Sequence, residues 1–166
     1  RWDPRAWEWW NVNPPGVAYE WTHPPLAKQI MAGSMLVLHD TDSWAWRLPG
    51  SLLGILSVFL VYLLGKVLFK NERISLMAAF IFSVDGLTFV QSRTGMNDIY
   101  YVTFVLISLL FFQNKKTFLS AIFLGLALCS KWAAIYLILI YFPFLLYQRR
   151  VKDLIFFNIY FLKTNK

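Results

Sequence analysis

The stretch LLGILSVFLVYLL, residues 52–64, decides the class of fold. It lies within eighteen consecutive residues that carry no charge, between Arg47 and Lys66. A bilayer core of about 30 Å requires roughly 20 helical residues, with about 17 as a practical minimum. The stretch therefore predicts a helix that crosses a membrane.

Four further apolar stretches follow along the chain. Asp85 is the one charged residue between Arg73 and Arg93, and uncharged stretches of sixteen, fourteen and seventeen residues come after it. A helix satisfies all its backbone polar groups internally, as lipid demands. Gly50, Gly54 and Gly125 are expected where such helices pack closely. The sequence predicts an all-α, polytopic membrane helix bundle with about five spanning helices, over residues 48–69, 74–91, 98–113, 117–131 and 132–148.

The composition agrees with this class of protein. Hydrophobic residues make up 58% and charged residues 15% of the 166, whereas soluble domains are about half apolar and about a quarter charged. One cysteine excludes an internal disulfide framework. One alternating set of loops holds eight basic residues and two acidic ones, so the positive-inside rule assigns it to the cytoplasm. The net charge of +7 is then explained by the basic loops on the cytoplasmic side of a membrane protein, and no nucleic-acid partner is expected.

The first 47 residues have a different character. They contain the turn signal NPPG and an apolar run from Leu26 to Leu38 that is too short to cross a bilayer. We expect an outer-face loop with an interfacial helix over residues 1–47, and the bundle over 48–166. All eight tryptophans fall on the outer side, either as an anchoring belt or as a shelf for lipid or sugar. A last apolar run, 154–162, is too short to span, so we expect a fragment truncated at both ends.

Ionisable residues in or near membrane spans are the candidate site residues. The fourteen-residue stretch before Lys131 extends only about 21 Å as a helix, which places this cation below the outer surface. Arg93, Lys131, His23 and Arg47 are predicted to converge as an anion site for a phosphate. The alternatives are that Arg93 only marks a turn, Arg47 reaches the interface beside Trp46, and His23 orders a loop.

Carboxylates are expected on the same side. Asp98 and Glu20 are predicted to act as acid, base or sugar-hydroxyl contacts, and Asp85 to support them. Asp85 could instead pair with Arg93 within the bundle, and Asp98 could mark a helix–helix turn. No metal site and no cofactor are expected, since the sequence has no Cys/His metal spacing. The alternative is an acidic metal site formed by Asp98 with carboxylates upstream of it.

Several ordered blocks carry a family resemblance. The blocks YEWTHPPLAK, WRLPGSLLG, FSVDGLTFVQSRTGMNDIYYV and LGLALCSKW, from Tyr19 to Trp132, resemble bacterial dolichyl-phosphate-mannose-protein mannosyltransferases. The resemblance implies a GT-C glycosyltransferase fold and an enzyme that transfers mannose from a polyprenyl phosphate to Ser or Thr of exported proteins. It implies chemistry at the outer face of a bacterial inner membrane, with inversion and without a tightly bound metal.

One family feature is missing from the sequence. The family carries an Asp-Glu pair in its first outer loop, and no adjacent Asp-Glu occurs here. We expect this pair upstream of Arg1, so that the fragment alone would be inactive. The matches in HPPL, QSR-x4-D and KW assign His23, Arg93, Asp98 and Lys131 to family positions.

Other functions remain open from the sequence. The acceptor could be a lipid or a wall polymer, and the chain could form a dimer. A non-enzymatic protein that binds lipid phosphate and an inactive scaffold are the alternatives from other classes.

Overall fold

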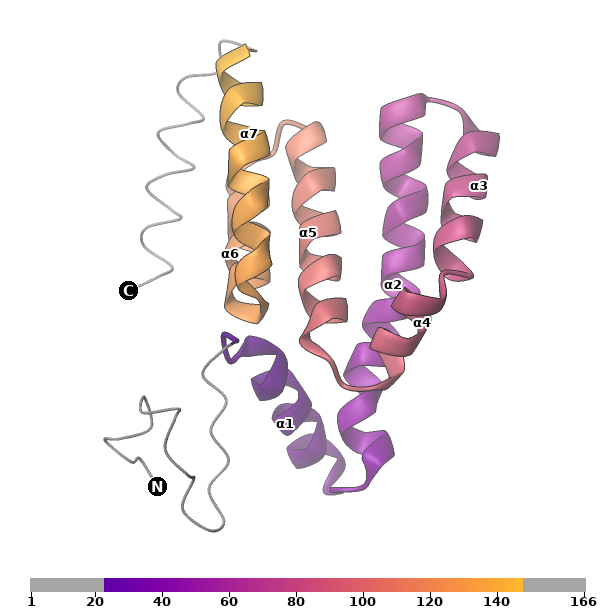
Figure 1. Cartoon of the computed structure of the whole chain (residues 1–166), viewed down its shortest axis with the longest axis vertical. Helices are drawn as coiled ribbons and strands as arrows, with labels where there is room; N and C mark the ends of the chain where they lie inside the picture. The colour runs from indigo at the N-terminus through magenta and orange to yellow at the C-terminus, as the bar shows by residue number, and fades with distance from the viewer. Residues whose placement is uncertain (1–22, 148–166) are drawn as a thin grey trace, which may run out of the picture.

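The structure, a computed structural model, describes residues 23–147, and within them every regular element is a helix. Figure 1 shows long helices running side by side, with one helix tilted across their lower end. The elements are α1 (Leu26–Leu38), α2 (Ser43–Phe69), α3 (Glu72–Ser83), α4 (Gly86–Arg93), α5 (Asn97–Gln113), α6 (Thr117–Ser130), the short 3-10 helix η1 (Trp132–Ile135) and α7 (Tyr136–Tyr147). The predicted all-α bundle is confirmed.

Helix α2 is long and apolar enough to cross a membrane. Its 27 residues correspond to about 40 Å at 1.5 Å per residue. It begins at Ser43, five residues before the predicted start, and Pro49 lies inside it. Proline at position 49 cannot donate a backbone hydrogen bond to the Ala45 carbonyl. The Ser34 hydroxyl of α1 donates to that carbonyl at 2.7 Å instead, so a neighbouring helix satisfies the group that Pro49 leaves open.

The predicted continuous helix over 74–91 is wrong, because the chain breaks at Val84 and Asp85. Helices α3 and α4 form an angle of 58°, and only together are they long enough to cross a membrane. Helix α3 ends at Ser83 with Val84 as its C-cap, and Asp85 caps the start of α4 by accepting a hydrogen bond from the Thr88 N–H at 2.8 Å. Aspartate favours this capping position, and the glycine that follows is a weak helix former.

Three further helical segments occupy the remaining predicted spans. Helices α5 and α6 are apolar but have 17 and 14 residues, and η1 interrupts the chain before α7. Within residues 23–147, one helix meets the length of a membrane span, or two if the bent pair counts as one. The five predicted segments are thus all helical, with α5, α6 and α7 shorter than a full crossing.

Small and hydroxylated residues bring the helices together. A Cβ on Gly54 would lie 2.7 Å from the Ser92 Cβ, and one on Gly65 would lie 3.0 Å from the Ser75 Cα. Helices α3 and α4 therefore approach the backbone of α2 closely, as small residues permit in membranes. Buried hydroxyls link the other helices, with Ser57 to Thr103 at 2.8 Å between α2 and α5.

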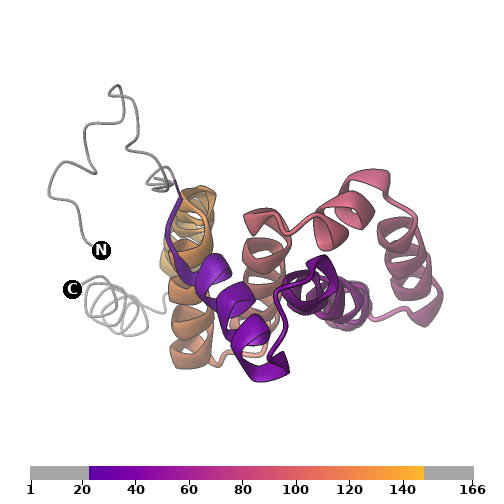
Figure 2. The ribbon, with the colours of Figure 1, turned by 90° about the horizontal axis from the view of Figure 1, so that it is seen from below.

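Helix α1 confirms the predicted short helix over Leu26–Leu38. It contacts α2, α5 and α6, and Figure 2 shows it lying across one end of the bundle. Its N-terminus lies near the end of α6, and its C-terminus leads into α2. The arrangement gathers the start of α1, the start of α5 and the end of α6 at one end of the molecule.

Candidate functional site

An ion pair joins the start of α5 to the end of α6. Asp98 lies in the first turn of α5, and Lys131 follows the last residue of α6. The Lys131 Nζ lies 2.6 Å from the Asp98 Oδ1. The two side chains are 26% and 21% exposed, so the pair is partly shielded from water and still accessible to a ligand.

Local backbone structure explains the position of each partner. A carboxylate in the first turn of a helix interacts favourably with the helix dipole, and Asp98 has this position in α5. Helix α6 stops because Lys131 adopts an extended conformation, with φ −157° and ψ 134°, although its N–H still bonds the Ala127 carbonyl. Because α5 and α6 are consecutive helices that pack against each other, these two termini meet.

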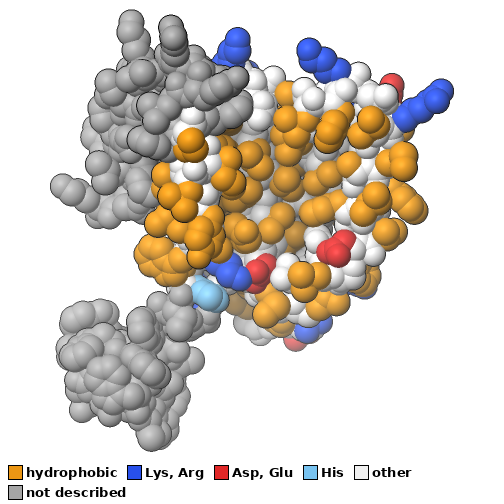
Figure 3. All heavy atoms as spheres, turned by 45° about the horizontal axis from the view of Figure 1, so that its top comes forward, with side chains coloured by type: hydrophobic (Ala, Val, Ile, Leu, Met, Phe, Trp, Pro, Cys, Tyr) orange, Lys and Arg blue, Asp and Glu red, His pale blue; other side chains and the backbone are white. Residues whose placement is uncertain are grey.

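The start of α1 lies beside this pair. Pro24, Pro25 and Gln29 line a cavity of about 230 Å³ together with Cys129 and Trp132, the residues that flank Ser130 and Lys131. His23, which is half-buried, directly precedes Pro24. The HPPL, ND and SKW motifs, far apart in the sequence, are thus neighbours in space. Figure 3 shows a basic and an acidic side chain in contact at the edge of the apolar face, with a histidine next to them.

Arg93 lies in different surroundings from Lys131. It is the last residue of α4, on the opposite side of the bundle from α6 and α7 (Figures 1 and 2). Its guanidinium lies over the Phe89 ring, 4.9 Å from the ring centroid. It lines a cavity between α2 and the bent helix pair, and Lys131 is not part of that cavity. The predicted single anion site formed by both cations is therefore not observed.

Arg47 is exposed and lies over the Trp46 ring, 4.7 Å from the ring centroid. This contact fits the alternative that Arg47 lies at the interface beside a tryptophan. Asp85 is exposed and caps α4, so the alternative that it pairs with Arg93 is not observed. Glu20 lies outside the described residues. No group of three potential metal ligands occurs within residues 23–147.

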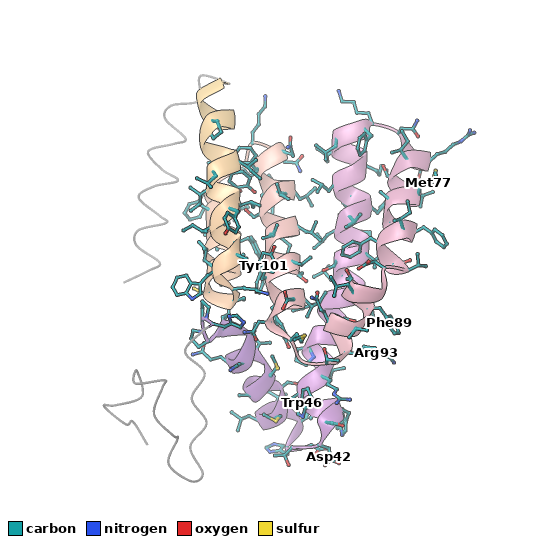
Figure 4. The ribbon with its side chains drawn as sticks, in the orientation of Figure 1. Asp42, Trp46, Met77, Phe89, Arg93 and Tyr101 are labelled. Atoms are coloured by element: carbon teal, nitrogen blue, oxygen red, sulfur yellow. The ribbon has the colours of Figure 1, made fainter. Side chains whose placement is uncertain are left out.

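The sequence analysis missed the contact that holds the loop between α4 and α5. Gly95 has φ +67°, and a Cβ at this position would lie 2.5 Å from the Trp46 ring. Trp46 therefore packs against the loop that connects Arg93, the last residue of α4, to the start of α5. Figure 4 shows Trp46 and Arg93 at the same end of the bundle. The sequence signal for this turn was the glycine of the Thr94–Gly95 pair, because glycine is favoured where the backbone adopts a positive φ.

Comparison with known proteins identifies the family of the chain. The model of the dolichyl-phosphate-mannose-protein mannosyltransferase family matches residues 22–162. The polyprenol-phosphate-mannose–protein mannosyltransferase of Corynebacterium glutamicum is 30% identical, with 70% of this chain and 28% of the relative covered. The protein of the same name from Mycobacterium tuberculosis is 26% identical, with 83% and 33% covered.

A more distant relative has another name. The dolichyl-phosphooligosaccharide-protein glycotransferase 2 of Archaeoglobus fulgidus is 31% identical, with 66% of this chain and 18% of the relative covered. No solved structure matches the chain. The chain spans a third or less of the length of these curated relatives. Because the family model covers most of its residues, the chain belongs to the dolichyl-phosphate-mannose-protein mannosyltransferase family of glycosyltransferases.

Proposed function

We propose that the protein transfers a mannosyl residue from a polyprenyl-phosphate donor to Ser or Thr of an exported protein. The reaction takes place at the outer face of a bacterial inner membrane. The observation that carries this proposal is the Asp98–Lys131 ion pair, partly exposed at the end of the bundle where α1, α5 and α6 meet. Carboxylate and ammonium groups at such a position are suited to binding sugar and acceptor hydroxyls.

The proposed mannosyl transfer requires a carboxylate that accepts a proton and cations that stabilise the leaving phosphate. The acceptor hydroxyl oxygen attacks the anomeric carbon of the sugar while the bond from that carbon to the phosphate oxygen breaks. The hydroxyl proton passes to a carboxylate, and polyprenyl phosphate leaves with the bonding electrons. Cationic side chains stabilise the negative charge that develops on the leaving phosphate.

The ion pair refines the roles of Asp98 and Lys131. Lys131 orients the Asp98 carboxylate, which then accepts hydrogen bonds from a sugar or acceptor hydroxyl. The pair carries no net charge, so it attracts a phosphate less than a free cation does. Arg93 is proposed as a phosphate ligand because of the family resemblance, although it lines a cavity that includes neither Asp98 nor Lys131. The same resemblance is the reason for proposing Glu20 as an acid or base and His23 as a phosphate ligand.

Charge placement supports the proposed sidedness. The ends of α2, α3, α5 and α6 that lie opposite Asp98 and Lys131, with the loops between them, carry one acidic residue, Glu72, and the basic residues Lys66, Lys70, Arg73, Lys115 and Lys116. Figure 3 shows basic side chains along that edge of the apolar face. By the positive-inside rule this edge faces the cytoplasm, so the ion pair faces outward.

A transfer assay tests the proposal on the full-length protein. The assay supplies polyprenyl-phosphate-mannose and a peptide with one Ser or Thr, and follows mannosyl peptide. Asp98→Asn and Lys131→Ala should each lower kcat/KM by about 5- to 150-fold, equivalent to about 1–3 kcal/mol. Lys115→Ala removes a lysine at the opposite end and should retain wild-type kcat/KM. Wild-type activity in both site variants would remove the pair from the mechanism, and mannose recovered only in lipid or polymer would identify a different acceptor.

A further inference from the structure

Exposed basic side chains line the end of the bundle that lies opposite the Asp98–Lys131 pair. Figure 1 shows that the α2–α3 and α5–α6 connections both lie at this end, and Figure 3 shows basic side chains along its edge. None of these cations forms an ion pair with an acidic side chain of residues 23–147. We call this set the basic edge; its members are Lys66, Lys70, Arg73, Lys115 and Lys116.

The one carboxylate at this end of the described residues is bound by a neutral group. Glu72 accepts a hydrogen bond from the Tyr62 hydroxyl at 3.1 Å. The basic edge therefore keeps a surplus of positive charge that no described side chain compensates. The positive-inside rule explains the sign of this surplus, but it does not explain where the ammonium groups lie.

Two of the lysines fold back over aromatic rings. The Lys66 Nζ lies 5.5 Å from the centroid of the Tyr62 ring, and the Lys116 Nζ lies 6.0 Å from that of the Phe111 ring. Tyr62 precedes Lys66 by four residues, which is about 6 Å along α2 toward the middle of that helix. Tyrosine rings and the ammonium groups of lysine meet at the depth of lipid head groups. The two contacts thus hold these cations near the apolar part of the bundle.

Exposed apolar side chains flank the cations. Leu68 and Phe69 follow Lys66 at the end of α2 and are 50% and 57% exposed, and Phe118 follows Lys116 and is 48% exposed. A surface that mixes exposed apolar and basic side chains suits the boundary between head groups and acyl chains. A partner in water, such as an acidic protein, would not provide acyl chains to cover these apolar side chains.

The two connections place lysine where the backbone disfavours it. Lys70 has a φ of 51° and Lys115 has a φ of 59°. This left-handed region favours glycine, and asparagine tolerates it better than other residues with a Cβ. Backbone preference therefore does not account for lysine at either position, whereas a role for its charge does.

We propose that the basic edge binds the head groups of anionic phospholipids. The α2–α3 connection supplies three cations and the α5–α6 connection two, and their N–H groups donate to phosphate oxygens. Each basic residue near an anionic membrane surface adds to the attraction. The proposed orientation of the protein enters only in assigning these head groups to the cytoplasmic leaflet.

Spin-labelled lipids test this assignment on the full-length protein in nanodiscs that contain equal amounts of phosphatidylglycerol and phosphatidylcholine. Electron spin resonance measures how much of each labelled lipid the protein immobilises, and the wild-type protein should prefer phosphatidylglycerol. Lys70→Asn combined with Lys115→Asn should lower this preference by about 5-fold, because two cations are lost from the surface. Asparagine suits the positive φ at both positions, so this variant should fold.

Lys70→Arg combined with Lys115→Arg is the matched control, because it retains both charges in the same backbone conformation. This variant should keep the preference of the wild-type protein, and added salt should weaken that preference by screening exposed charges. No preference in the wild-type protein, or an equal loss in the arginine and asparagine variants, would overturn the assignment. If the wild-type protein has no lipid preference but binds polyglutamate in phosphatidylcholine nanodiscs, the partner is an acidic protein and the assignment also fails.

The lipid measurement uses no mannose donor, so its outcome is independent of the proposed function. A preference for phosphatidylglycerol without mannosyl transfer to any peptide would refute the function and support the basic edge. Mannosyl transfer without a lipid preference would support the function and refute the basic edge.

Discussion

At the scale of single residues, the Asp98–Lys131 pair combines a structural role with the proposed chemical one. The pair joins two helix ends that are partly shielded from water, so removal of one partner leaves the other charge poorly compensated. A structural role requires opposite charges at the two positions, whereas the chemical role also requires the carboxylate on α5. Exchanging the charges distinguishes these roles.

The exchange gives the first prediction. Asp98→Asn should lower the free energy of unfolding of the full-length protein by about 1–3 kcal/mol. The double variant Asp98→Lys with Lys131→Asp should recover part of this loss, since the helix dipole disfavours lysine at the start of α5. It should not recover mannosyl transfer. Unfolding followed by tryptophan fluorescence and the transfer assay provide the two measurements, and recovery of both would assign the pair a structural role alone.

Gly95 provides a second prediction at this scale. Its φ of +67° disfavours any other residue by about 1–2 kcal/mol, and a Cβ would collide with the Trp46 ring. Gly95→Ala should therefore destabilise the protein by at least about 1 kcal/mol. Gly33→Ala is the matched control, because a Cβ at Gly33 of α1 would meet no atom within 4 Å. Alanine at a helical position should be neutral or stabilising, and equal losses of stability in the two variants would contradict the account.

At the scale of the elements, Pro49 and Ser34 act together. Ser34→Ala leaves the Ala45 carbonyl without its side-chain donor and should cost about 0.5–1.5 kcal/mol of unfolding free energy. The Pro49→Ala variant restores a backbone N–H four residues after Ala45. In that background Ser34→Ala should cost less. A double-mutant cycle from denaturant unfolding measures the difference, and additive effects would show that the carbonyl does not link the two residues.

The break between α3 and α4 depends on Asp85. Asp85→Asn should keep the capping interaction with the Thr88 N–H, whereas Asp85→Ala should lose it and lower the midpoint of thermal unfolding. Circular dichroism melts of the full-length variants make the comparison. If asparagine and alanine lower the midpoint equally, the carboxylate matters for its charge and not for the cap.

The sequence predicted some of these helices and contacts and did not predict others. The length of the uncharged stretches predicted the helical segments that α2, α5, α6 and α7 occupy, but it did not predict the break between α3 and α4. The position of Lys131 below the outer membrane surface stays a prediction. The same reasoning placed Arg93 with Lys131, because distance along a helix says nothing about which neighbour a side chain faces. Arg93 ends α4, which packs against α2 on the other side of the bundle from α6, and Lys131 follows α6. The signal for the bend, Asp followed by Gly, was present at a position that hydropathy assigned to one span.

At the scale of the whole molecule, the two ends of the bundle differ in chemistry. One end carries the ion pair, Arg93 and helix α1, and the other carries the basic loops. Nucleotide sugars remain in the cytoplasm, while a polyprenyl-phosphate sugar can be presented at the outer surface. The proposed function therefore requires that the end with the ion pair faces outward.

Labelling of single cysteines in intact cells tests this orientation. In a cysteine-free full-length background, which removes Cys129 beside the candidate site, we expect Asp42→Cys to react with a membrane-impermeant maleimide. Asp42 precedes α2 at the end with the ion pair, and Lys115 connects α5 to α6 at the other end. Lys115→Cys should react only after the cells are permeabilised, because its loop belongs to the basic, cytoplasmic set. The reverse pattern would place Asp98 and Lys131 in the cytoplasm, where they could not serve a donor presented at the outer surface.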